Sequence, residues 1–383
     1  MCILYNTMKF ADIVGNKEVV RHLRAMVDEG HLPHAIVIEG PEGSGKLKMA
    51  RALAQYIHCE NHTPEGDSCG TCASCMQHSH HSHVDVHFSF PMLKKGNKKT
   101  DDTECEDWID EWREFLDESS YADLEIWLSK LGNINGQPVI YKGEADALRR
   151  ALSFTARASQ YKIAIIWLPE RLHDSAANKL LKLVEEPFSD TRIIMVINNP
   201  GEILPTIYSR LQRIKVKRLS DSDTAEIVKS AYPEILPDDA IAIAHVSDGN
   251  ANLAMKLAGV DGGDNLHRFI DLMRTAYRKD IAALRKWSLD MHSIGREAQI
   301  NFLTYCSRMF RENYISNFGV SSINYMTVDE TAFSRNFSRF INNNNVIPLV
   351  NEMDKAAKDI AANSSARIVF FDLAIKVVLL IKQ

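Results

Sequence analysis

No apolar segment of this 383-residue chain approaches the roughly 20 residues that a membrane-spanning helix needs. The first residues, Met1 to Tyr5, also lack the basic start and the long apolar stretch of a secretion signal. These absences argue against membrane insertion and secretion. We therefore expect a cytoplasmic protein with no membrane partner.

No stretch of the sequence combines basic and aromatic residues as a nucleic-acid-binding surface does, and the net charge is only −5. Acidic residues are concentrated in residues 101–125, where twelve of them accompany a single basic residue, Arg113. The remainder of the chain therefore carries a net charge of +6. This distribution argues against an acidic binding protein as a whole, and it leaves room for a mildly basic working face.

Cysteine is scarce, with seven residues in the chain, and four of them fall between positions 59 and 75. An odd number with such crowding does not suit a disulfide framework and is more typical of a metal site. The crowded residues follow the pattern Cys-x9-Cys-x2-Cys-x2-Cys and are Cys59, Cys69, Cys72 and Cys75. Since a Cys-x2-Cys turn can direct two thiolates at one ion, the spacing predicts a structural, four-coordinate Zn²⁺ in a module spanning 59–75.

Two alternatives to four-cysteine ligation remain at this stage. Six histidines lie close by, at positions 58, 62, 78, 80, 81 and 83. One of them could replace a cysteine as ligand, although for most of them we expect a solvated, histidine-rich helix end. The other alternative is four reduced thiols in a loop, against which the regular spacing argues. Ligation by all four cysteines leaves no open position for a catalytic water.

Strands and helices are expected to alternate in the N-terminal part of the chain. The predicted strands are residues 35–39, 162–168 and 192–197, and the predicted helices include residues 16–29, 144–158 and 174–186. This alternation is typical of an α/β domain with a mostly parallel sheet. Residues 94–140 interrupt it, and their aromatic residues at helical spacing predict an insertion with one or two helices.

From about residue 219 onward the strand signals fade. The predicted helices there are residues 221–231, 238–246 and 251–258, followed by a linker at 259–263 and a helical region from 265 that ends in a buried helix at 368–381. We therefore expect three domains. They are an α/β domain at 1–218, a small helical domain at 219–262 and an all-α domain at 263–383.

A glycine-rich turn with the pattern GxxxxGK follows the first predicted strand and precedes a helix. Its expected phosphate-binding residues are Gly40, Gly43, Gly45 and Lys46. Glycines let backbone N–H groups converge on phosphate oxygens, and the helix N-terminus adds its positive dipole end. The pattern therefore predicts a phosphate loop.

The side chains that would hold magnesium in such a site are missing. Position 47, where a Ser or Thr hydroxyl binds the metal, is Leu47. The strand at 162–168 ends in Trp167 and Leu168, where an ATPase places an Asp and usually a Glu. We therefore expect no ATP hydrolysis by this chain and weak or absent ATP binding.

Together these motifs resemble those of the bacterial clamp-loader subunits of the AAA+ class. The cysteines are inserted just after the phosphate-loop helix, as in that family. Further motifs that carry the resemblance are Phe10–Gly15, Leu32–Ala35, Asp174–Pro187 (DSAANKLLKLVEEP) and Ser209-Arg210-Leu211. The resemblance implies an AAA+ fold with a zinc knuckle, a small helical lid at 219–262 and, by position more than by motif, an oligomerisation collar at 263–383.

Within this family, the degenerate phosphate site resembles that of the delta prime type, which does not hydrolyse ATP, more than that of the gamma/tau motor. The resemblance implies a subunit of DNA polymerase III that joins motor and delta subunits in a hetero-oligomer and helps load a sliding clamp onto primer-template DNA. It also implies that Arg210 acts in trans as an arginine finger on ATP bound by a neighbouring motor subunit. Asn252 stands where a motor subunit would have its sensor arginine.

The sequence also allows two other interpretations. The first is a catalytically active clamp-loader ATPase of the gamma/tau type, which would need Lys46 and unconventional metal ligands. The second is a zinc-dependent nucleic-acid-binding module with a vestigial AAA+ core.

Overall fold

The computed structural model describes residues 9–118, 121, 123–133, 136–319 and 324–382. The chain divides into two compact units, one comprising Met1–Ile227 with Asp248–Asn252, the other Val228–Ser247 with Leu253–Gln383. None of the helices in the described part of the chain has both the length and the apolar character needed to cross a membrane.

A five-stranded parallel sheet lies at the centre of the first unit, in the order β2-β3-β4-β1-β5. The strands are β1 (Ala35–Glu39), β2 (Val86–Ser89), β3 (Lys162–Trp167), β4 (Thr191–Ile197) and β5 (Gln212–Lys215). Every residue of β1 and β3 is buried, as their continuous apolar runs predict. The expected strands at 35–39, 162–168 and 192–197 are thereby confirmed, whereas β2 was not anticipated.

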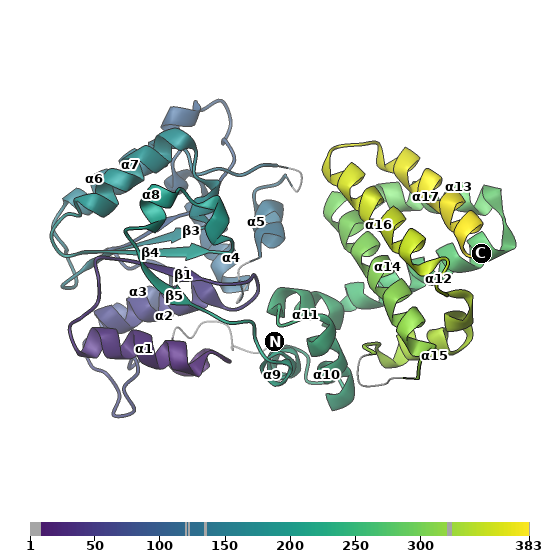
Figure 1. The fold of residues 1–383 in the computed structure, drawn as a ribbon. Coiled ribbons are helices and arrows are strands. Elements are labelled where there is room, and N and C mark those ends of the chain that lie inside the picture. The colour runs from purple at the N-terminus through teal and green to yellow at the C-terminus, as the bar shows by residue number, and fades with distance from the viewer. Residues whose placement is uncertain (1–8, 119–120, 122, 134–135, 320–323, 383) are drawn as a thin grey trace. The chain divides into compact units, whose positions relative to one another are not determined.

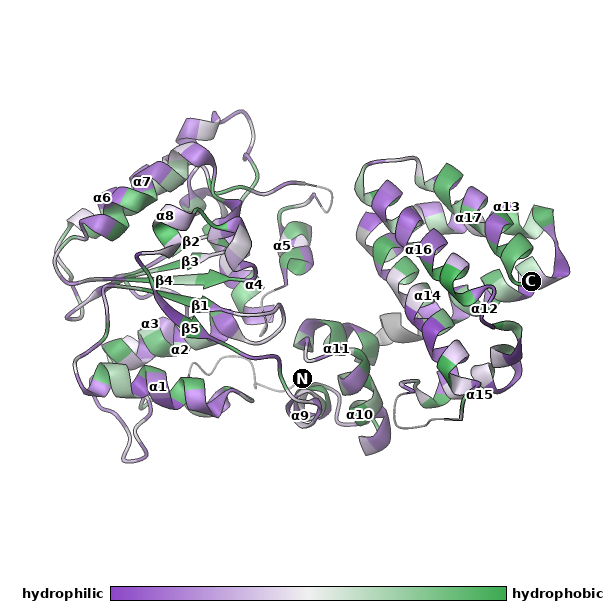
Figure 2. Cartoon of the chain, in the orientation of Figure 1, coloured by the Kyte–Doolittle hydropathy of each residue, from purple (hydrophilic) through white to green (hydrophobic). Residues whose placement is uncertain are grey.

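Helices cover both faces of this sheet (Figure 1). One face packs against α1 (Lys17–Asp28), α2 (Lys46–His58), α4 (Ile109–Glu118) and α5 (Leu124–Lys130). The other packs against α6 (Lys142–Ser153), α7 (Asp174–Glu185) and α8 (Pro205–Tyr208). Alternation along β1 sends Ile36 and Ile38 to the first face and Val37 to the second. Figure 2 shows apolar and polar residues alternating along α6 and α7, as expected of helices with one buried face.

The insertion at 94–140 is folded onto the sheet, as its aromatic residues predict. It contains α4 and α5, preceded by the short 3-10 helices η2 (Thr100–Asp102) and η3 (Cys105–Trp108). Trp112, Phe115 and Trp127 are fully buried and belong to the same core as β3. Its acidic residues form ion pairs with basic residues of the insertion itself and of α6, among them Glu111 with Lys95 at 2.8 Å and Asp101 with Lys142 at 2.9 Å.

The remaining elements of the first unit are short. They are η1 (Phe10–Asp12), α3 (Ala73–Ser79), η4 (Pro169–Arg171) and η5 (Pro200–Glu202). Three helices follow the sheet, α9 (Asp221–Ala231), α10 (Pro237–Val246) and α11 (Ala251–Ala258), close to the predicted ranges.

The C-terminal part of the chain is helical, as expected. Its elements are α12 (Val260–Arg278), α13 (Ile281–Ser293), α14 (Arg296–Ser316), α15 (Val328–Phe337), η7 (Ser338–Phe340), α16 (Val346–Ala361) and α17 (Ala366–Leu380). They share one hydrophobic core. The linker predicted at 259–263 is wrong, because α12 begins at Val260. The division into domains at 218 and 262 stays a prediction.

The C-terminal helix differs from the expected fully buried one. Phe370, Leu373 and Val377 of α17 are buried, but Ile368 is 70% exposed and Leu379 is 64% exposed. The apolar run at 368–381 is interrupted only by Asp372 and Lys376, and these two charged residues lie on the exposed face with Ile368, so burial on all sides was the wrong inference.

Candidate phosphate loop and metal centre

The glycine-rich turn joins β1 to α2 and adopts the backbone shape that its sequence predicts. Gly43 and Gly45 have φ angles of 70° and 82°, which side-chain-bearing residues rarely adopt. At Gly40 a Cβ atom would stand 2.3 Å from the carbonyl oxygen of Val216. The loop therefore requires glycine at these positions, and α2 begins directly after it at Lys46.

Side chains of the same unit approach this loop closely. The Asn250 Oδ1 atom lies 2.0 Å from the position that a Cβ at Gly43 would occupy, and the Ala251 N–H donates to the Gly43 carbonyl at 3.2 Å. The Tyr121 ring lies 3.4 Å from the corresponding position at Gly45. Asn252 donates to the Tyr121 carbonyl oxygen at 3.3 Å. Asn252, which stands at the expected sensor position, is therefore hydrogen-bonded to the insertion.

Lys46, which would reach a nucleotide's phosphates, is engaged by its own loop. Its Nζ donates to the Pro41 carbonyl oxygen at 2.5 Å, and the residue is only 5% exposed. Burial lowers the pKa of Lys46 to about 8, although the negative charges of Glu42 and Glu170 oppose this shift. The ammonium group thus faces a carbonyl and two carboxylates of this chain.

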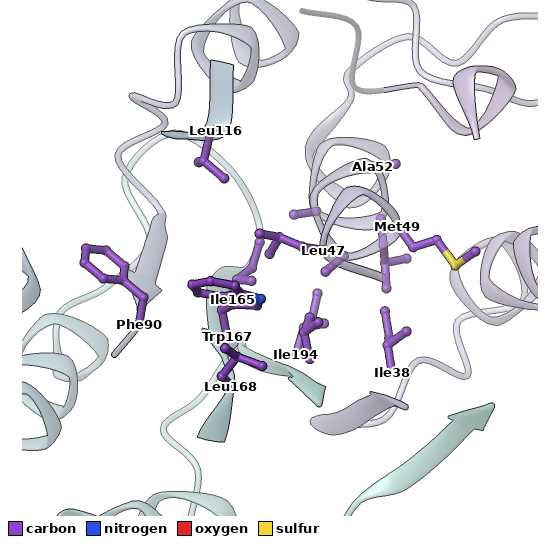
Figure 3. Close-up of a cluster of buried hydrophobic side chains, with 14 of the residues drawn as sticks. Ile38, Leu47, Met49, Ala52, Phe90, Leu116, Ile165, Trp167, Leu168 and Ile194 are labelled. Atoms are coloured by element: carbon purple, nitrogen blue, oxygen red, sulfur yellow. The ribbon is translucent and has the colours of Figure 1, made fainter. Parts of the chain in front are cut away.

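Three apolar residues that stand where an ATPase has metal-binding side chains lie in the hydrophobic core. Leu47, Trp167 and Leu168 are exposed by 4%, 3% and 2% respectively. Figure 3 shows Leu47 and Trp167 within one cluster of buried apolar side chains. The Trp167 ring centroid lies 5.3 Å from that of Trp112 and 5.3 Å from that of Phe115, both in α4. The insertion therefore packs against the residue that replaces the expected metal-binding Asp.

The four clustered cysteines converge, each offering a sulfur within 4.8 Å of the others. Cys59 follows α2, Cys72 caps α3 and Cys75 lies within α3. The Sγ atoms of Cys69 and Cys75 are 3.9 Å apart. Zn–S bonds of about 2.3 Å in a tetrahedron place sulfurs about 3.8 Å apart, so this donor set fits zinc.

Backbone N–H groups point at these sulfurs, as in a compact metal-binding turn. The N–H groups of Thr71 and Cys72 donate to Cys69 Sγ at 3.4 and 3.3 Å. These bonds lower the pKa of Cys69 to about 6. Burial instead raises the pKa of Cys75. The first effect favours the thiolate form that binds metal.

Asp67 connects the cysteine module to the N-terminal segment of the unit. Its carboxylate accepts the N–H groups of Phe10 and Ala11 at 3.2 and 2.8 Å, at the start of η1. The Phe10 side chain is 2% exposed and lies 5.5 Å from the Tyr56 ring in α2. The module thus fixes the start of the Phe10–Gly15 segment, one of the motifs that carry the family resemblance.

The expectation of solvated histidines is wrong for four of the six. His58, His78, His81 and His83 are buried, with exposures of 4%, 7%, 8% and 4%. Burial lowers the pKa of His58 to about 4 and that of His78 to about 2, so both rings are neutral near pH 7. The burial of His78 could have been predicted from its spacing, because it follows Cys75 by three residues and therefore shares its face of α3.

Arg210 lies on the surface between α8 and β5. Its guanidinium pairs with Glu185 at the end of α7, with 2.8 Å between the two groups, and donates to the Thr206 carbonyl oxygen at 2.7 Å. The side chain is 43% exposed. Because an exposed pair of this kind contributes little to stability, Arg210 can exchange its partner at low cost.

Comparisons with known proteins place these features in a family. The sequence model described as DNA polymerase III, delta subunit, matches residues 15–220. The chain is 26% identical over 246 residues to DNA polymerase III subunit gamma/tau of Mycobacterium tuberculosis, which covers 61% of this chain and 35% of the relative. It is 30% identical over 186 residues to DNA polymerase III subunit delta' of Haemophilus influenzae, covering 48% of this chain and 43% of the relative.

The matched region thus spans less than half the length of these relatives. Among solved structures, a DNA polymerase III gamma subunit-related protein of Thermotoga maritima aligns with 11% identity and a TM-score of 0.39, covering 94% of this chain and 99% of the other.

Proposed function

Because the chain belongs to the DNA polymerase III delta subunit family, within the clamp-loader subunits of the AAA+ class, we propose that it is a non-hydrolysing subunit of the delta prime type. In this role it joins gamma/tau-type motor and delta subunits in a hetero-oligomer that places a sliding clamp on primer-template DNA. Residues 1–218, 219–262 and 263–383 would then serve as nucleotide-binding-like domain, lid and collar.

The observation that carries the proposal is the burial of Leu47, Trp167 and Leu168 in the hydrophobic core. A Mg²⁺ ion needs oxygen ligands in a nearly octahedral arrangement, and these side chains offer none. The Lys46 contact with the Pro41 carbonyl oxygen also occupies the group that would bind phosphate. These features favour the proposal over an active ATPase of the gamma/tau type.

A direct ATPase assay on the purified chain separates the two. We expect the wild-type chain and Lys46→Ala to show the same background turnover with Mg-ATP, because no side chain holds the metal. Turnover by the wild-type chain clearly above that of Lys46→Ala would instead establish an active enzyme.

We further propose that Arg210 contributes the arginine finger to a neighbouring subunit's ATP. Its exposure and its weak ion pair with Glu185 leave the guanidinium available to a partner. An arginine finger accelerates phosphoryl transfer on the order of 10³-fold or more, because it stabilises charge developing on the transferred phosphoryl group.

In an assembled loader, Arg210→Ala should lower DNA- and clamp-stimulated hydrolysis at the adjacent site by a factor on the order of 10³. Arg210→Lys should rescue poorly, because lysine lacks the planar fork that spans two phosphate oxygens. Arg213→Ala, which removes an exposed arginine from β5, serves as the charge-matched control. Normal hydrolysis by a fully assembled Arg210→Ala complex would refute the finger, and failure to assemble would make Arg210 an interface residue.

Zn²⁺ is the ion we propose for the four-cysteine site, in a structural role. Cys59, Cys69, Cys72 and Cys75 supply the tetrathiolate donor set that zinc prefers, and no fifth protein ligand is needed.

A further inference from the structure

Three buried histidines form a second cluster beside the cysteine module. His58 is the last residue of α2, His78 lies in α3, and His83 lies in the turn that leads to β2. One ring nitrogen of each lies within 4.8 Å of the corresponding nitrogens of the other two. The three rings thus come from the end of α2, from α3 and from the segment between α3 and β2.

The hydrogen bonds of His58 leave a lone pair directed into this cluster. Its Nε2 lies 2.8 Å from the Tyr161 carbonyl oxygen. Since a carbonyl oxygen only accepts, Nε2 carries the proton and Nδ1 is unprotonated in the neutral ring. Nδ1 accepts a hydrogen bond from Nε2 of His78 at 3.0 Å, and a metal ion bound by both nitrogens would replace this bond. Histidines that ligate metals commonly donate their second N–H to a backbone carbonyl, which orients the ring.

The third ring is held by two longer contacts. His83 Nδ1 lies 3.2 Å from the Asp85 backbone nitrogen, and Nε2 lies 3.1 Å from the Ser74 hydroxyl. Ligation through one nitrogen gives up one of these contacts. Zn–N bonds of about 2.0–2.1 Å hold ligands about 3.4 Å apart in a tetrahedron, so side-chain shifts of about 1 Å close the site.

We propose that His58, His78 and His83 form a second metal site, distinct from the four cysteines, for a divalent transition-metal ion such as Zn²⁺ or Co²⁺. Imidazole donors suit these ions, whereas Mg²⁺ and Ca²⁺ require oxygen ligands. The fourth position falls to a water or to the Ser74 hydroxyl.

Charge also favours a cation here. Four thiolates and one Zn²⁺ carry a net charge of −2, and Cys59 is covalently next to His58. A dication held by three neutral imidazoles balances that charge. The guanidinium of Arg51 opposes it, but that group is hydrogen-bonded to His81, and Asp117 offsets its charge.

Metal stoichiometry of the full chain tests the proposal. After equilibration with excess Zn²⁺ and desalting, the wild-type chain should hold two zinc ions by native mass spectrometry. His78→Ala should hold one, and His80→Ala, which alters an exposed neighbour, should hold two. Cys72→Ser should retain the histidine-bound ion. A single zinc in the wild-type chain, or two in His78→Ala, would overturn the second site.

Co²⁺ spectra distinguish the two sites. The cysteine site gives thiolate-to-cobalt charge-transfer absorption in the near ultraviolet, whereas a histidine site does not. We expect His78→Ala, and independently His83→Asn, to halve bound cobalt while the charge-transfer intensity per chain stays unchanged. A folded variant that loses this absorption together with all its cobalt would show that the histidines only support the cysteine site.

Discussion

Glu144 is a buried acid with no cation bonded to it in the described part of the chain. It lies in the first turn of α6, is 4% exposed, and accepts the Cys105 N–H at 2.7 Å. Burial raises the pKa of Glu144 from 4.5 to about 7. The residue joins α6 to the start of the insertion, so its protonation affects how firmly the insertion is held.

Stability of the chain should therefore depend on pH through this residue. Between pH 4.5 and 7 the folded state keeps the Glu144 proton and the unfolded state loses it, so stability falls as pH rises. The loss should reach about 3 kcal/mol and level off above pH 7. Denaturant unfolding across this range measures it. Glu144→Gln should remove this contribution, and Glu106→Gln, at an exposed position, should keep it; equal pH profiles for wild type and Glu144→Gln would contradict the assignment.

At the scale of elements, the cysteine module joins the end of α2, helix α3 and η1. A metal ion bound by the four cysteines should therefore stabilise the surrounding unit as well as the loop itself, because the Asp67 carboxylate bonds the module to the N–H groups of Phe10 and Ala11.

Cys72→Ser should lose the module's zinc and lower the free energy of unfolding by several kcal/mol, because metal binding is coupled to folding. Metal analysis combined with thermal unfolding checks both effects. Glu65→Gln, at an exposed position of the same module, should retain metal and stability. Freshly purified, unchelated wild-type protein without zinc would defeat the prediction.

Most elements of the sheet and its helices follow from local patterns, because β1, β3 and β4 are continuous apolar runs and the flanking helices are amphipathic. β2 was missed because its four residues, Val86–Ser89, are mostly half-buried and include His87. The convergence of the four cysteines could be predicted from their spacing in the sequence alone. The burial of the histidines, and the packing of Trp112 on Trp167, depend on tertiary contacts that no local pattern encodes.

At the scale of the whole molecule, α17 offers apolar residues that its own unit leaves uncovered. Ile368 and Leu379 are 70% and 64% exposed, and eleven residues, close to three helical turns, place them on one face. Asp372 and Lys376 lie between them on this face and form an ion pair. A surface that combines apolar residues with charged ones suits contact with another subunit.

Ile368→Asp combined with Leu379→Asp should leave the isolated chain folded, with stability changed by about 0.5 kcal/mol per exposed substitution. If the chain joins a clamp loader as proposed, copurification with the other subunits should nevertheless fall. Phe154→Asp, which alters an exposed apolar residue of the first unit, is the matched control. Undiminished copurification of the double variant would remove α17 from the assembly surface.

The aromatic contacts of Trp167 also constrain how this lineage can evolve. An aspartate at position 167 would place an unpaired charge between Trp112 and Phe115, which costs several kcal/mol before any metal is gained. A Ser or Thr hydroxyl at position 47 would not by itself complete a magnesium site without that aspartate. If the chain does not hydrolyse ATP, as proposed, no single substitution at positions 47 and 167 would restore a metal site, and the packing of α4 on Trp167 would make the loss of hydrolysis hard to reverse.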